Sequence, residues 1–131
     1  MGVFTNIEAA LNTRLATLSA SPPVQWPNTH YQPIENTTYI RPTLLPTSTA
    51  LEAVSGAEEH KGIYQIDVFV PLEKGVSALN TLLDNIESLF KSNKTLIATD
   101  IIYIQAISRG RAQRQDSWFV SFVEVNYLCY S

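Results

Sequence analysis

The sequence predicts an α+β domain, a mainly antiparallel sheet with two helices packed on one face, in the order α-β-β-α-β-β-β. Two segments, residues 4–18 and 76–90, carry apolar residues every three or four positions, as amphipathic helices do. Other segments alternate apolar with polar residues or are rich in β-branched and aromatic residues, as strands are. The 131 residues suit one domain, spanning residues 1–131.

The first helix is expected at residues 4–18. Thr5, followed three positions later by Glu8, is the expected N-cap, because this spacing satisfies free backbone N–H groups of the first turn. The proline pair at 22–23 is expected to stop the helix, and residues 21–37 are interpreted as irregular chain around a short strand. The apolar stripe comprises Phe4, Ile7, Leu11, Leu15 and Leu18.

Two strands and a long loop are expected next. Residues 38–45 form a strand in which Pro42 lacks an N–H group and so belongs at a sheet edge or bulge. Residues 46–61 are small and polar, which predicts a long mobile loop that a neighbouring subunit orders. Residues 62–70 form the clearest strand. Its faces are apolar (Tyr64, Ile66, Val68, Val70) and mixed (Ile63, Gln65, Asp67, Phe69).

The second half begins with a helix at 76–90, which has a wide apolar stripe. Strands are expected at 95–99 and 100–108, then a basic loop at 109–114, then a last strand from 117 to about 127 or beyond. The start of that strand, Trp118-Phe119-Val120, is apolar on both faces. Such a strand is either covered on both sides or pairs with another subunit.

The sequence offers no catalytic, cofactor-binding or metal-binding set. It has no glycine-rich phosphate loop and no nucleophile motif. His30, His60 and Cys129 do not have metal-site spacing, and one cysteine cannot form an internal disulfide. Asp67 and Asp100 could in principle pair as carboxylates, although aspartates in strands are more often solvated or protect an edge. We therefore expect a protein that is not an enzyme.

Composition narrows the class further. With no signal peptide and no apolar run of membrane-spanning length, the sequence predicts a soluble domain from a reducing compartment. A charged fraction of 16% is low and favours self-association, and a net charge of −3 does not suggest a nucleic-acid-binding protein.

One basic cluster, Arg109, Arg111 and Arg114, stands out as a candidate interface. It either contacts a carboxylate-rich partner or passing DNA phosphates, or it merely keeps a hairpin loop soluble. Gly110 would allow a tight turn there. Trp118 and Trp26 are either interface anchors or core tryptophans.

Several segments together resemble one family, the small phage and prophage proteins related to the tail terminators, or tail completion proteins, of long-tailed phages. The resemblance covers residues 4 to about 127, and residues 126–131 depart from the pattern. The segments that carry it are YIRPTLLP at 39–46, GIYQIDVF at 62–69, and Ser108-Arg109-Gly110 with Trp118 downstream.

The resemblance implies a structural virion protein without cofactors. Copies form a homohexameric ring at the head-proximal end of the tail, which stops growth of the tail tube and meets the head-tail connector protein. DNA passes through the lumen without specific binding, no membrane is involved, and assembly occurs in the host bacterial cytoplasm. The expected interface residues are Arg109, Arg111, Arg114, Trp118 and Arg41. The alternative is a small non-enzymatic adaptor or regulatory domain acting as monomer or dimer.

Overall fold

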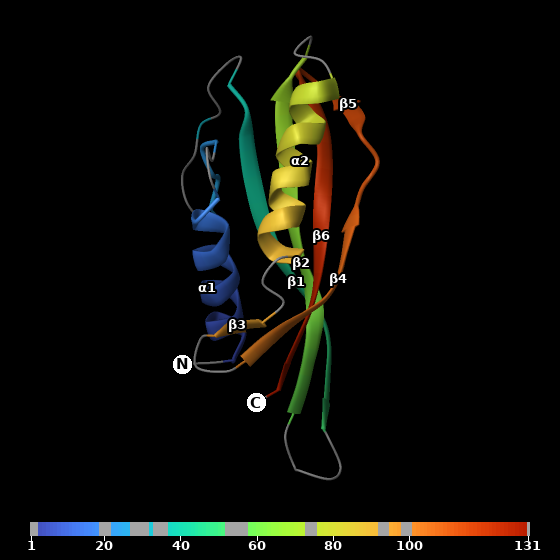
Figure 1. Ribbon diagram of the computed structural model, residues 1–131. Coiled ribbons are helices and arrows are strands. Elements are labelled where there is room, and N and C mark those ends of the chain that lie inside the picture. The colour runs from blue at the N-terminus through green and yellow to red at the C-terminus, as the bar shows by residue number, and fades with distance from the viewer. Residues whose placement is uncertain are drawn as a thin grey trace.

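A computed structural model describes residues 3–18, 22–26, 32, 37–51, 58–72, 76–91, 95–97 and 101–130. One sheet carries both helices on the same face (Figure 1), and the predicted class and order are confirmed. The elements are α1 (Val3–Ala16), β1 (Tyr39–Leu51), β2 (Glu58–Pro71), α2 (Val76–Lys91), β3 (Thr95–Ile97), β4 (Ile101–Arg109), β5 (Gln113–Gln115) and β6 (Trp118–Tyr130).

The sheet has the strand order β1-β2-β6-β4-β3, with every neighbouring pair antiparallel. The short strand β5 pairs with β6 beyond the end of β4, so the chain from β4 to β5 follows β6 along one side. At the other side β1 is the edge strand, which confirms the edge predicted for Pro42.

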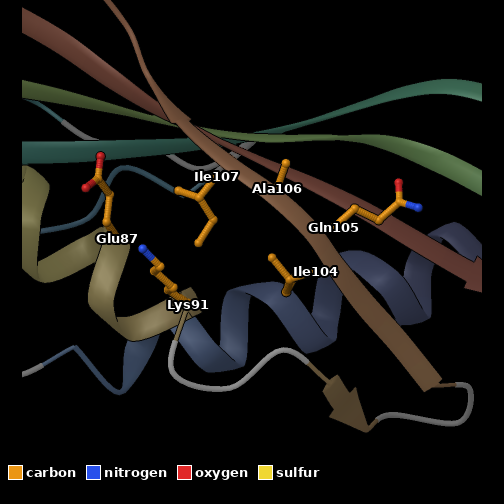
Figure 2. A pocket seen from close by; sticks show the side chains of 6 residues that line it. All are labelled: Glu87, Lys91, Ile104, Gln105, Ala106 and Ile107. Atoms are coloured by element: carbon orange, nitrogen blue, oxygen red, sulfur yellow. The ribbon is translucent and has the colours of Figure 1, made fainter.

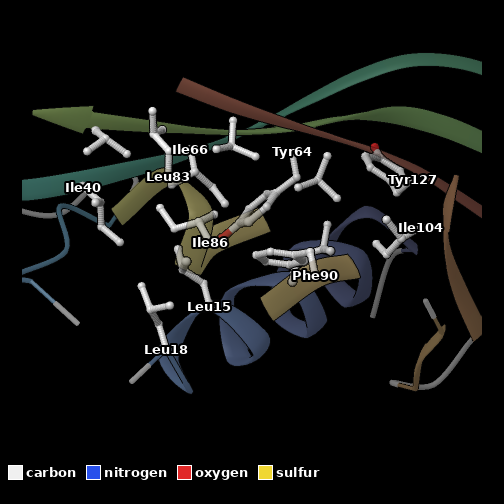
Figure 3. Packing of buried hydrophobic residues seen from close by; sticks show 14 of the residues in the cluster. Leu15, Leu18, Ile40, Tyr64, Ile66, Leu83, Ile86, Phe90, Ile104 and Tyr127 are labelled. Carbon is white, nitrogen blue, oxygen red and sulfur yellow. The ribbon is translucent and has the colours of Figure 1, made fainter. Parts of the chain in front are cut away.

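The main core lies between the helices and one face of the sheet (Figure 3). Helix α2 contains neither Gly nor Pro and buries Leu79, Leu83, Ile86 and Phe90, which recur at helical spacing. From the sheet, the predicted apolar face of β2 is confirmed, because its four residues are all buried in this core. The opposite, helix-free face has a separate small cluster of Tyr39, Phe69 and Val120, with Trp118 packed against it.

The loop predicted at 46–61 is wrong for most of its length. Residues 46–51 belong to β1 and 58–61 to β2, while 52–57 lie outside the described residues. Composition misled the interpretation, because small polar residues form strands once a neighbouring strand pairs with them, as β2 does with residues 46–51. Residues 59–61 pair with both β1 and β6. His60 in this stretch is buried.

Helix α1 differs from its prediction at both ends. It begins at Val3, so Thr5 lies inside the first turn rather than at the N-cap. It ends at Ala16, well before the proline pair. Short-range bonds close this end: the amide groups of Thr17 and Leu18 donate to the carbonyl oxygens of Arg14 and Leu15 at 3.1 and 3.0 Å. In the segment expected to be irregular, Val24 forms an isolated parallel bridge with Ile40.

The two largest fully buried side chains are tyrosines in unlike settings. The hydroxyl of Tyr64 donates to Asn12 Oδ1 at 2.5 Å, whereas the hydroxyl of Tyr127 is buried and has no hydrogen-bond partner among the residues that the structure describes. The Tyr127 ring packs against Gly62 on β2, where an added Cβ would lie 2.3 Å from the hydroxyl oxygen and 2.8 Å from the Leu45 carbonyl oxygen. Gly62 is therefore needed for space.

Replacing each tyrosine with phenylalanine should have opposite consequences. Tyr64→Phe should lower the free energy of unfolding by about 1–2 kcal/mol, because Asn12 loses its buried partner. Tyr127→Phe should leave it unchanged or raise it, because an unsatisfied hydroxyl disappears. Urea denaturation of the two variants beside the wild type measures both values, and equal losses would contradict the assignment.

The same tyrosines predict loss of stability at alkaline pH. Burial raises the pKa of Tyr127 to about 12, and burial, with a smaller contribution from the charge of Glu8, raises the pKa of Tyr64 still further. Both values exceed the unfolded pKa of about 10, so the unfolded chain ionises first. The contribution of the two neutral hydroxyls to folding stability is therefore complete below about pH 10 and is lost as pH rises through about 12. In a spectrophotometric titration the two hydroxyls should ionise only late or on unfolding. Release of both near pH 10 from folded protein would overturn this.

Candidate functional site

On the helix-free face, Arg41 and Asp67 form an ion pair near the end of the sheet where β6 begins. Arg41 Nε and one terminal nitrogen donate to Asp67 Oδ2 at 3.3 and 3.2 Å, and Gln65 Nε2 donates to Asp67 Oδ1 at 2.9 Å. The guanidinium also lies 4.9 Å from the centroid of the Phe69 ring, a cation–π contact. Asp67 is thus an ion-pair partner of Arg41, and Asp100 lies outside the described residues. The Arg41 side chain remains 44% exposed.

Trp118 belongs to the aromatic cluster of the same face. Its ring meets Tyr39 edge-on, with centroids 5.1 Å apart and an interplanar angle of 87°, while Tyr39 and Phe69 stack at 4.4 Å. Trp118 is half-buried, so it packs within the subunit and keeps a partly accessible surface. Trp26 is also half-buried and packs against the main core instead.

Arg109 lies on the helix side of the sheet, at a largely exposed position. As the last residue of β4, it donates from Nε and a terminal nitrogen to the two carboxylate oxygens of Glu87 at 3.0 and 3.1 Å, and also to Asp84. The hydrogen bonds to Glu87 and, to a smaller extent, the hydrogen bond to Asp84 raise the pKa of Arg109. The side chain therefore connects β4 to α2 and is engaged within the subunit.

Arg111 and Arg114 are exposed, but the segment that carries them is not a hairpin loop. Arg114 lies on β5, opposite Phe119 of β6, and Arg111 lies between β4 and β5. The tight turn comes later, at Asp116, which has a positive φ of 52°. The basic segment therefore runs along the side of the sheet.

Gly110 is required for a reason that the sequence did not reveal. An added Cβ would lie 2.2 Å from the Phe122 ring, so the ring occupies the space a side chain would need. The Gly110 N–H donates to the Phe122 carbonyl oxygen at 2.8 Å, and Ser121 Oγ donates to the Gly110 carbonyl oxygen at 3.0 Å. Close packing, not a tight turn, explains this glycine.

Three exposed large apolar side chains on the helix-free face were missed by the sequence analysis. Leu45, Tyr103 and Tyr130 are 38–41% exposed. Register places Leu45 beside Ile63 and Tyr103 beside Leu128, and the rings of Tyr103 and Tyr130 meet edge-on at 6.5 Å. Each of the three alternates along its strand with residues of the helix side, and this alternation in the sequence could have indicated that their side chains lie on the opposite face. We call Tyr103 and Tyr130 the exposed apolar cluster; Leu45 lies apart from them on the edge strand β1.

A cavity of about 240 Å³ lies between α2 and β4 (Figure 2). Glu87 and Lys91 line it from α2, and residues 104–107 line it from β4. No group of three metal-ligating side chains occurs in the described part of the chain. None of the described helices is long and apolar enough to span a membrane.

Comparison with known families agrees with this architecture. The family model described as phage tail terminator protein matches residues 6–127. This chain belongs to that family. Membership implies a structural role in the phage tail, as part of the virion. No curated protein matches this tail terminator family member.

One solved structure has the same fold as this tail terminator family member. It superposes with a TM-score of 0.77 at 21% sequence identity, and the match covers 98% of this chain and 96% of the other. At that identity the likeness establishes the fold alone.

Arg109 and Arg111 provide a matched pair for testing which arginine is structural. Arg109→Met should lower the free energy of unfolding by about 1 kcal/mol, because three charge-assisted hydrogen bonds at a largely exposed site are lost, and the loss should shrink in 1 M salt. Arg111→Met should change it little. Denaturant midpoints at low and high salt measure this, and equal effects of the two substitutions would remove the structural role of Arg109.

Proposed function

We propose that the chain assembles into a ring, expected to be a homohexamer, that caps the head-proximal end of the phage tail tube. The ring ends polymerisation of the tube protein and joins the tail to the head-tail connector protein. The observation that carries this proposal is the match to the tail terminator family over residues 6–127. The uncovered sheet face supports it, because a partner would shield the exposed apolar cluster from water.

Three arginines gather at one end of the sheet and suit docking on the tube. Arg41 pairs with Asp67, Asp67 pairs with Phe122, and Phe122 is hydrogen-bonded to Gly110, so Arg41 and Gly110 lie in one row across the sheet. Arg111 follows Gly110 directly. Arg114 lies further toward the same end. We call Arg41, Arg111 and Arg114 the basic end. Arg41 is paired with Asp67, so the charges of Arg111 and Arg114 in particular favour encounter with an acidic surface on the last tube ring and help to fix its register.

The net charge suits the passage of DNA. Each chain carries −3 at pH 7, so a ring of copies repels phosphates overall and does not retain the genome by charge. Arg109, one of the basic residues, is neutralised by Glu87 and Asp84 within the subunit. A lumen lined by acidic side chains would therefore be a passage and not a binding site.

Removing the exposed charges of the basic end should impair tail assembly without unfolding the subunit. In the variant Arg111→Ala/Arg114→Ala, stability should stay within about 0.5 kcal/mol of wild type, since exposed charges contribute little. Overlong or headless tails should become the majority in electron micrographs. Lys61→Ala, which removes an exposed cation at the far end of β2, is the control and should give normal tails. Normal tail length and yield in the double variant would refute docking through the basic end.

A further inference from the structure

Between residues 40 and 46, the β1 edge of the sheet offers almost no outward N–H group that is free for a partner. The Ile40 N–H donates to the Pro23 carbonyl oxygen and its C=O accepts from the Gln25 N–H, so the Ile40 backbone points away from β2. Backbone direction alternates along an antiparallel strand, and therefore Pro42, Leu44 and Pro46 also point outward. Proline has no N–H to donate. Between residues 41 and 46, only Leu44 offers an outward donor.

The opposite edge, at β4, keeps its donors. The Gly110 N–H donates to the Phe122 carbonyl oxygen and so points toward β6. By the same alternation Ser108 and Ala106 point toward β6, and Ile107 and Arg109 direct their N–H and C=O groups outward. Strand β3 pairs only with residues 101–103, and no described strand pairs with the outer side of residues 105–109. One edge therefore offers mainly acceptors and the other offers both groups.

The two edges also match in level and direction. Leu44 pairs with Tyr64, Tyr64 with Val125, and Val125 with Ile107, so Leu44 and Ile107 occupy one cross-strand row. Pro42 and Arg109 share the next row in the same way, through Ile66 and Val123. Three successive antiparallel pairings make β1 antiparallel to β4. Rotating one copy about an axis parallel to the strands keeps every residue in its row and keeps the direction of every strand. Such a rotation therefore sets β1 of one copy, antiparallel and in the same rows, against β4 of the next.

We propose that β1 of a second copy of this chain adds to β4 as an antiparallel strand. Leu44 exchanges two hydrogen bonds with Ile107, next to the stretch of the edge that residues 23–25 already occupy at Ile40. The interface is heterologous, since unlike edges meet, and heterologous contacts repeat around a ring. This inference rests on the proposed ring and names its subunit contact. The prolines disfavour the competing contact, β1 against β1, because that pairing lacks donors.

Side chains on both faces of the joined sheet fit this contact. Leu44 of the second copy has its side chain on the helix side of the sheet, beside Ile107 and the cavity of about 240 Å³ between β4 and α2 (Figure 2). Leu45, which is 41% exposed, comes to lie on the helix-free side next to Ala106, because their rows coincide through Ile63 and Asn126. Both apolar side chains lose exposed surface in the contact.

Disulfide trapping tests the pairing directly. Leu45 and Ala106 would form a non-hydrogen-bonded pair with Cα atoms about 4.5 Å apart, within the range that a disulfide spans. The native thiol is removed first by Cys129→Ala. In that background, Leu45→Cys and Ala106→Cys proteins are oxidised separately and as an equimolar mixture. The mixture should give at least ten times more covalent dimer than either alone, and the double variant should give a ladder of higher multimers.

The alternatives have separate signatures. Dimer from Ala106→Cys alone would show β4 against β4, dimer from Leu45→Cys alone would show β1 against β1, and no crosslink in the mixture would refute strand addition. Leu44→Pro removes the remaining outward donor of β1 without touching the bonds to β2, so it should abolish the crosslink. Leu44→Ala keeps the N–H and should retain it.

Failure of this interface is distinguishable from failure of the proposed function. A wild-type protein that yields tails of normal length, while the cysteine mixture stays uncrosslinked, overturns the interface and leaves the function standing. A mixture that crosslinks, from a protein whose loss leaves tails unchanged, supports the interface and overturns the function.

Discussion

The long pairing of β2 with β6 is the constraint on which the rest of this structure depends. It is unbroken from Glu59–Tyr130 to Pro71–Trp118, and it lies in the middle of the sheet. Because its register is continuous, one set of alternating residues faces the helices and the other faces away along its whole length. A slip of one residue would bring Asp67 into the main core and expel Tyr64. The same pairing sets Gly62 against Tyr127 and extends the β1–β2 hairpin beyond the helices.

Two groups of ion pairs in the described part of the chain hold elements together. Arg41 and Asp67 join β1 to β2, and Arg109 joins β4 to α2 through Glu87 and Asp84. Exposed ion pairs contribute modestly to stability, but each of these also fixes the direction of a long side chain. Exposed arginines at one end of the sheet, together with apolar side chains on the face opposite the two described helices, are accessible to partners.

Proline in the edge strand has two consequences. A missing N–H makes Pro42 and Pro46 harmless to the fold, since both point away from β2, and it also blocks pairing of like edges. The unlike edge at β4 retains donors, so the sheet distinguishes its own two sides. An asymmetry of this kind is what a ring of identical subunits requires, since closed dimers arise when like surfaces meet.

Local patterns determined much of this protein in advance. The stripe at 76–90 and the alternation at 62–70 depend only on near neighbours in the chain, and both were recovered as α2 and β2. The edge position of Pro42 followed from its missing N–H. A set of sequence segments, taken in their order along the chain, indicated the tail terminator family. Only the tertiary structure decided that the polar residues around 46–51 and 58–61 form strands, that Arg109 is bound by α2, and that Gly110 makes room for Phe122. Each of those outcomes depends on a partner from a distant part of the chain, and local periodicity carries no information about such partners.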